Sequence, residues 1–191
     1  MKHAHFEATR DLVRHVRLRE ALGRAPKERS QDDVEHVLDF LRSVWRATDR
    51  LGPERTEQVA RTAVRKTFPR GEDVVVEGDR GTTFYVIAFG SAAVKKDGRQ
   101  VATLEVGGSF GEASLEAGAP RRNATITASS QELELLELHK RDYDRIMRKW
   151  RDEERRRAFE CLKTTPMFRT APPSPQEIVA VPVCSHCGRL S

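Results

Sequence analysis

The segment that decides the fold reads Gly107-Gly108-Ser109-Phe110-Gly111-Glu112-Ala113-Ser114-Leu115, and after a short loop it continues as Pro120-Arg121-Arg122-Asn123-Ala124-Thr125-Ile126. Glycines let a backbone approach a ligand closely and present N–H groups to it. A short helical turn after Phe110 would direct such groups at an anion. An arginine on the return of the loop would clamp a phosphate with two hydrogen bonds, and a glutamate can accept hydrogen bonds from sugar hydroxyls. The segment therefore predicts a loop that holds a sugar phosphate.

Short runs of β-forming residues surround this loop between positions 64 and 138. Asp97-Gly98, between two of these runs, is a tight hairpin signal. Many short strands at regular spacing predict an antiparallel barrel or jelly roll. The runs are 74–76, 84–87, 92–94, 101–104, 124–127 and 133–138. The glycines Gly71, Gly78, Gly81 and Gly90 are interpreted as turn residues that only build this β domain.

Helical patterns flank the β-rich region on both sides. Ser30 followed by Asp33 resembles a capping box, and apolar residues then recur at helical spacing as far as Trp45. Gly52-Pro53 ends this helix, and Pro53 can begin the next. Residues 139–163 return to a helical pattern rich in opposite charges. A looser stripe near the N-terminus consists of Leu12, Val13, Val16 and Leu22. The predicted fold is α+β, an antiparallel β jelly-roll barrel flanked by N- and C-terminal helices.

The chain resembles the cyclic-nucleotide-binding domain superfamily, which includes protein kinase A regulatory subunits, Epac-type exchange factors, cyclic-nucleotide-gated channels and bacterial catabolite activator proteins. Phe110-Gly111-Glu112 and Arg122-Asn123-Ala124-Thr125 fit the core of the family's phosphate-binding cassette. Residues 69–79 and 81–90 resemble the family's first strands and their turns. The resemblance covers residues 30–163, and it implies a cyclic nucleotide, cAMP or cGMP, as the ligand.

The resemblance also implies roles for the cassette residues. Glu112 is expected to bind the ribose 2′-hydroxyl. The backbone of Gly111, Ala113 and Ser114 is expected to line the sugar phosphate, and Ser114 can add a hydroxyl contact. The helix that begins near Arg141 resembles the family's hinge helix and lid, which folds over the base when ligand is bound.

The phosphate clamp has two candidates, because the cassette carries tandem arginines. Counting back from Thr125 places Arg122 at the family's clamp position, whereas counting forward from Glu112 places Arg121 there. We favour Arg122 because it immediately precedes the small residues that begin the next strand. Asn123 follows at a position that influences cyclic nucleotide selectivity in the family, and the choice between cAMP and cGMP stays open.

The sequence divides into three predicted regions. Residues 1–29 are a basic N-terminal segment, residues 30–163 are the cyclic-nucleotide-binding domain with its flanking helices, and residues 164–191 are a Pro-rich irregular tail. The stretch 161–168 resembles the lead-in to a second domain of the same kind. The tail is therefore interpreted as a candidate truncated start of that domain.

The predicted function is a regulatory module that binds cAMP or cGMP, shifts its C-terminal helix and acts on an unidentified protein effector. No nucleophile triad, paired carboxylates or P-loop can be read from the sequence, so no enzyme activity and no catalytic residue are predicted. The alternative is a degenerate fold that serves as a ligand-free scaffold for protein interactions. Titration with cAMP and cGMP separates the two hypotheses.

Composition bounds the location and partners of this chain. Of its 191 residues, 38% are hydrophobic and 33% charged, and no apolar run approaches the roughly 18 residues of a membrane span. We predict a cytoplasmic protein with no membrane span. The net charge of +5 is spread over arginines that alternate with acidic residues, and the tail offers no room for a helix-turn-helix, so DNA is not an expected partner.

The three cysteines, Cys161, Cys184 and Cys187, are an odd set outside the β-rich region, which agrees with a reducing compartment. Cys184-Ser185-His186-Cys187 resembles half of a zinc site, but a structural site needs four ligands. No metal and no cofactor are predicted.

Overall fold

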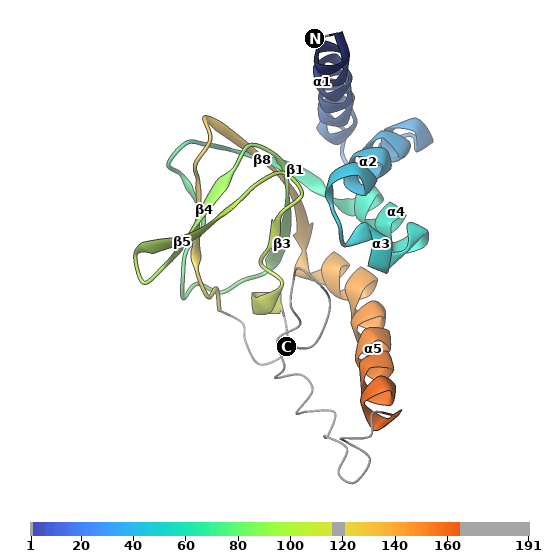
Figure 1. Cartoon of the computed structure of the whole chain (residues 1–191), viewed down its shortest axis with the longest axis vertical. Helices are drawn as coiled ribbons and strands as arrows, with labels where there is room; N and C mark the ends of the chain where they lie inside the picture. The colour runs from blue at the N-terminus through green and yellow to red at the C-terminus, as the bar shows by residue number, and fades with distance from the viewer. Residues whose placement is uncertain (1, 116–120, 165–191) are drawn as a thin grey trace. The chain divides into compact units, whose positions relative to one another are not determined.

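The computed structural model describes residues 2–115 and 121–164 and divides into two units, residues 1–146 and 147–191. The first unit contains the N-terminal helices, the strands and the beginning of helix α5 (Lys140–Thr164), and the remainder of α5 belongs to the second (Figure 1). The tail with Cys184-Ser185-His186-Cys187 lies outside the described residues. The predicted region boundaries at residues 29 and 163 stay predictions.

Four helices precede the strands: α1 (Lys2–Gly23), α2 (Gln31–Val44), α3 (Thr48–Leu51) and α4 (Pro53–Thr62). The capping box at the start of α2 is confirmed, because Ser30 Oγ accepts from the Asp33 backbone N–H at 3.1 Å and an Asp33 carboxylate oxygen accepts from the Ser30 N–H at 2.8 Å. Pro53 begins α4 as predicted. None of the described helices combines the length and the apolar character that a membrane span requires.

The strands form two antiparallel four-stranded sheets with the orders β1-β8-β3-β6 and β2-β7-β4-β5. Asp97 and Gly98, with φ of 50° and 73°, form the tight turn between β4 and β5 that the sequence predicts. The strands are β1 (Val64–Pro69), β2 (Asp73–Val75), β3 (Thr83–Phe89), β4 (Ala92–Lys96), β5 (Arg99–Leu104), β6 (Ser109–Phe110), β7 (Thr125–Ala128) and β8 (Glu132–His139).

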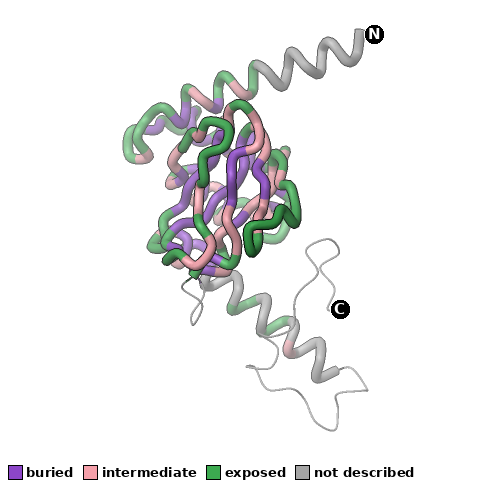
Figure 2. Tube along the Cα trace, turned by 90° about the vertical axis from the view of Figure 1, so that its left-hand side faces the viewer, coloured by how far each residue is buried: buried purple, intermediate pink, exposed green. Residues whose placement is uncertain are grey.

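One hydrophobic core is shared by the two sheets. Tyr85, Ile87, Ala92, Phe110, Ile126, Ala128, Leu133 and Leu135 form a single buried cluster with members from both sheets. Figure 2 shows that the buried positions concentrate along the strands and on the N-terminal helices. The predicted antiparallel β domain with flanking helices is therefore confirmed. The ladders of the described strands make two separate sheets, and they do not close into the continuous barrel that we expected.

Helix α1 follows its predicted apolar stripe only in part, because Leu22 is buried but the two valines are not. Val13 and Val16 are 47% and 48% exposed, whereas Leu18 is fully buried. The helix instead directs His15 and Arg19 toward Glu134 of β8. The predicted stripe is therefore wrong at both valines, and the side of the helix that faces the sheet carries buried apolar residues together with partners of a buried carboxylate.

Glu134 is the centre of this ion-pair cluster and is only 1% exposed. Arg19 pairs with one of its carboxylate oxygens, and Arg65 Nη1 lies 3.6 Å from the other. His15 Nε2 is 3.6 Å from the carboxylate, and its ring lies 4.7 Å from that of Phe89, the cross-strand neighbour of Glu134. The hydrogen bond to Glu134 is the largest cause that raises the pKa of Arg19. The carboxylate therefore attaches α1 to the sheet.

Replacing Glu134 with glutamine should lower the free energy of unfolding by about 1–3 kcal/mol, because the buried cluster loses its anion while its volume is preserved. Urea denaturation measures this loss. Glu132→Gln is the matched control, since Glu132 lies in the same strand and also bonds Arg19 but its side chain is 45% exposed. Its effect should stay below about 1 kcal/mol. Equal losses in the two variants would contradict the assignment.

The capping box makes stability depend on pH. Hydrogen bonds from the Ser30 side chain and backbone, followed by the Arg24 charge, hold the pKa of Asp33 below its usual value. A carboxyl with a lower pKa in the folded state stabilises the fold above its unfolded pKa, about 4, and this contribution is lost as the pH falls below that value toward the folded pKa. Asp33→Asn should therefore flatten the acid side of the stability curve, as measured by thermal melting from pH 3 to 7. Asp32→Asn, at an 82%-exposed side chain outside the capping box, should leave the shape of that curve unchanged.

Candidate functional site

The loop that the sequence singles out begins at strand β6 and turns sharply at Gly111. Phe110 pairs with Tyr85 of β3, and their rings stack with centroids 5.1 Å apart. Gly111 then adopts a φ of +97°, and a Cβ at this position would lie 2.7 Å from the Thr83 carbonyl oxygen and 2.6 Å from Arg122 Nη1. Both the conformation and the close approach require glycine. The chain continues into a short 3-10 turn, η1 (Ala113–Leu115).

Arg122 reaches into this loop from the far side and is only 6% exposed. Its Nη1 donates to the Gly111 carbonyl oxygen at 3.1 Å and to Ser114 Oγ at 2.8 Å. Its Nη2 donates to Thr83 Oγ1 at 2.8 Å. Its backbone N–H donates to the Asp79 carbonyl oxygen at 2.7 Å. We call these three acceptors around the guanidinium, Gly111 O, Ser114 Oγ and Thr83 Oγ1, the arginine cradle.

The cradle surrounds the charge of Arg122 with neutral oxygens. All three acceptors, one backbone carbonyl oxygen and two hydroxyl oxygens, are neutral. Burial lowers the pKa of Arg122, and the nearby Tyr85 and Glu112 oppose that shift. Because a buried charge is costly unless it is paired, this site favours the arrival of an anionic ligand.

The other predicted site residues are not all part of the cradle. Ala113 and Ser114 lie on η1, while Glu112 is exposed beside Gly111 and close enough for its charge to affect Arg122. Arg121 is exposed, and its Nη1 donates to the Gly78 carbonyl oxygen at 2.7 Å. Asn123 is also exposed, and no hydrogen bond between the described residues joins it to the loop. The structure thus brings Gly111, Ser114 and Arg122 together and directs Arg121 to a different turn.

Two residues of the site were missed by sequence reasoning. Gly81 is interpreted above as a turn glycine, but a Cβ at Gly81 would lie 1.9 Å from Ser114 Oγ and 2.9 Å from Arg122 Cζ. It is therefore a close-contact residue of the cradle, and that interpretation is incomplete. Thr83, which supplies the third acceptor, precedes the predicted run 84–87 and is not among the predicted site residues. No local sequence pattern marks Gly81 or Thr83 as a site residue, because Ser114 and Arg122, which they contact, lie about 30 to 40 positions further along the chain.

Helix α5 begins in contact with the loop. The backbone N–H of Lys140, its first residue, donates to the Thr82 carbonyl oxygen at 2.8 Å, and Lys140 Nζ donates to the Leu115 carbonyl oxygen at 2.6 Å. The second bond joins the root of α5 directly to the end of η1.

Comparison with known proteins places this geometry in a family. The model of the cyclic nucleotide-binding domain matches residues 65–149, which include the loop, the cradle and the beginning of α5. This segment belongs to the cyclic nucleotide-binding domain family. The match begins in β1, so α1 to α4 precede the part of the cyclic nucleotide-binding domain that the family model covers.

Relatives and solved structures agree with this assignment. The chain is 32% identical over 136 residues to the cAMP-dependent protein kinase regulatory subunit of Hypocrea atroviridis, covering 64% of this chain and 29% of that protein. It is 28% identical over 129 residues to human Rap guanine nucleotide exchange factor 3, covering 67% of this chain and 14% of that protein. The regulatory domain of Toxoplasma gondii PKA, solved with cAMP, superposes with a TM-score of 0.56 at 27% identity, covering 66% of this chain and 50% of that one. The chain thus spans under a third of the length of these two curated relatives.

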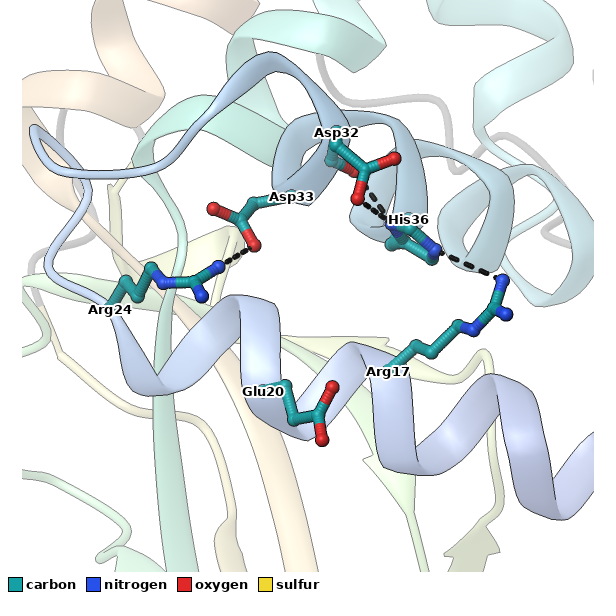
Figure 3. A pocket seen from close by; sticks show the side chains of 6 residues that line it. All are labelled: Arg17, Glu20, Arg24, Asp32, Asp33 and His36. Carbon is teal, nitrogen blue, oxygen red and sulfur yellow. Dashed lines mark hydrogen bonds and ion pairs between the residues drawn. The ribbon is translucent and has the colours of Figure 1, made fainter.

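An open pocket lies between α1 and α2, outside the family match (Figure 3). It has a volume of about 420 Å³ and is lined by Arg17, Glu20, Arg24, Asp32, Asp33 and His36. Arg24 pairs with Asp33. His36 Nδ1 lies 2.6 Å from the Asp32 carbonyl oxygen and therefore donates, which leaves Nε2 to accept from Arg17 at 3.4 Å. These contacts join the two helices.

Proposed function

We propose that this domain binds a cyclic nucleotide, cAMP or cGMP, and acts as a regulatory module without catalysis of its own. The observation that carries the proposal is the arginine cradle. A guanidinium that is 6% exposed and held by neutral oxygens beside a glycine turn favours a ligand that supplies negative charge. A cyclic phosphate supplies that charge within a compact group.

In this proposal Arg122 pairs with the cyclic phosphate, and the backbone of Gly111, Ala113 and Ser114 lines the sugar phosphate. Glu112 accepts hydrogen bonds from the ribose 2′-hydroxyl. The burial of Arg122, against the exposed position of Arg121, supports Arg122 as the phosphate clamp. The cAMP-dependent kinase subunits among the relatives, and the cAMP present in the Toxoplasma gondii structure, make cAMP the first ligand to test.

The proposed output is a shift of α5 that a protein effector reads. The bond from Lys140 Nζ to the Leu115 carbonyl oxygen supports it, because a ligand that moves η1 must strain or break that contact.

A jelly roll is the proposed arrangement of the two sheets. Its support is the nested pairing of β1 with β8, β2 with β7, β3 with β6 and β4 with β5, which a long hairpin forms when it rolls up. A cytoplasmic location is likewise part of the proposal.

Isothermal titration of the chain with cAMP, cGMP and 5′-AMP tests the proposal. Saturable binding of a cyclic nucleotide that is tighter than binding of 5′-AMP supports it. Absence of heat at about 1 mM ligand, which corresponds to a binding free energy weaker than about −4 kcal/mol, favours the ligand-free scaffold instead. Hydrogen exchange at the start of α5, measured with and without ligand, reports on the movement of this helix.

A further inference from the structure

We infer that Thr83 is a positioning residue for the cyclic phosphate, because its hydroxyl orients the Arg122 guanidinium before ligand arrives. This inference rests on the proposed function. Thr83 is the first residue of β3 and is 9% exposed. It does not belong to the loop that the sequence identifies as the cassette, and it reaches Arg122 only through the tertiary fold.

The direction of each hydrogen bond around Thr83 follows from its geometry. A threonine hydroxyl has one proton to donate and lone pairs with which to accept. Thr83 Oγ1 lies 3.0 Å from the Tyr85 hydroxyl and donates to it. It accepts from Arg122 Nη2 at 2.8 Å, since a guanidinium can only donate. The proton of Thr83 is thereby committed to Tyr85, and its lone pair is directed at the arginine.

Tyr85 fixes the other end of this chain of contacts. Its ring stacks on Phe110, the residue before Gly111, and it lies below the guanidinium, whose Cζ is 6.0 Å from the ring centroid. Burial raises the pKa of Tyr85, which keeps the phenol protonated at neutral pH. The guanidinium is thus held at Nη2 by Thr83 and at Nη1 by Gly111 and Ser114, and two anchored nitrogens define the plane of a rigid group.

The neutrality of Thr83 matters as much as its position. A carboxylate at this place would also orient the guanidinium, but it would cancel the charge that attracts a phosphate. The hydroxyl orients Arg122 and leaves that charge for the ligand. Preorganisation of this kind lowers the conformational cost of binding, so its loss should appear directly as weaker affinity.

The test compares three single variants with the wild-type chain by titration with cAMP and cGMP. Thr83→Val preserves the side-chain volume and removes the hydroxyl, and it should weaken binding about tenfold. Thr83→Ser restores the hydroxyl and should bind within about twofold of the wild type. Thr82→Val is the matched control, because Thr82 is exposed and contributes only its backbone carbonyl to Lys140. It should also bind within about twofold of the wild type.

Thermal melting of each variant separates loss of positioning from loss of the fold, and Thr83→Ala replaces Thr83→Val if the valine lowers the melting temperature. A weaker Thr83→Val or Thr83→Ala that the serine rescues supports the inference. Wild-type affinity in the variant without a hydroxyl overturns it while the proposed function stands. A serine variant as weak as the valine variant also overturns it. A wild-type chain that binds neither nucleotide overturns the proposed function, and the role of Thr83 with it.

Discussion

Alanine at position 122 is expected to weaken cyclic nucleotide binding by about tenfold to hundredfold, because the phosphate loses a charge-assisted hydrogen bond worth about 1.5–3 kcal/mol. Truncation also leaves Ser114 Oγ and Thr83 Oγ1 without the donor that Arg122 supplies, while Gly111 O keeps the bond from Ser114 Oγ. Isothermal titration measures the loss in affinity. Circular dichroism verifies that the β domain is still folded.

Arg121→Ala is the matched control for this variant, because Arg121 is the adjacent arginine and is exposed with its side chain on the Gly78 carbonyl oxygen. It should cost less than about threefold in affinity. Arg122→Lys should recover little of the loss, since a lysine ammonium cannot reach both sides of the cradle in one plane. If Arg121→Ala proved the more damaging change, the clamp would be Arg121 and the alternative count along the cassette would be right.

A methyl group at position 81 should weaken ligand binding by about tenfold or more, although Gly81 lies outside the cassette. Its Cβ would lie 1.9 Å from Ser114 Oγ and 2.4 Å from Ser114 Cβ, and a short buried side chain has no room to retreat. Ser114 must move, and Arg122 Nη1, which donates to it, moves as well. Overpacking of this degree costs about 1–3 kcal/mol, which is distributed between stability and affinity.

A second substitution identifies the cause of that loss. In Gly81→Ala/Ser114→Gly the obstructing side chain is absent, so the double variant should bind more tightly than Gly81→Ala alone. Gly23→Ala is the control for adding a methyl group, because a Cβ there meets no atom within 4 Å. Unchanged affinity and melting temperature in Gly81→Ala would show that Ser114 and Arg122 do not lie against Gly81 in solution.

Most of the secondary structure could be predicted because its signals are local. The capping box at Ser30, the helix start at Pro53 and the Asp97-Gly98 turn depend on residues that are neighbours in the chain, and all three are confirmed. Strands β1 and β6 were not foreseen as separate runs. β1 has the sequence Val-Arg-Lys-Thr-Phe-Pro, without clear alternation, and β6 has only two residues. Their pairing with β8 and β3 defines them as strands.

The site was predictable to the extent that its chemistry lies on one loop. Gly111, Ser114 and Arg122 are close in sequence, and the cassette pattern identifies them. The choice between two adjacent arginines could not be made by counting, because an inserted residue shifts the count. Burial separates them, with Arg122 inside and Arg121 outside. Burial is a property of the assembled sheets.

The sequence by itself determined the resemblance to a known family, most of the helices and strands, and the glycine-turned loop with its carboxylate and arginines, since each depends on residue types at short spacings. Only the tertiary structure decided which arginine is enclosed, that Gly81 and Thr83 complete its surroundings, and that Glu134 attaches α1. The physical reason is the same in all three cases. Hydrogen bonds and steric contacts between segments distant in the chain depend on how sheets and helices pack. No local sequence pattern specifies that packing.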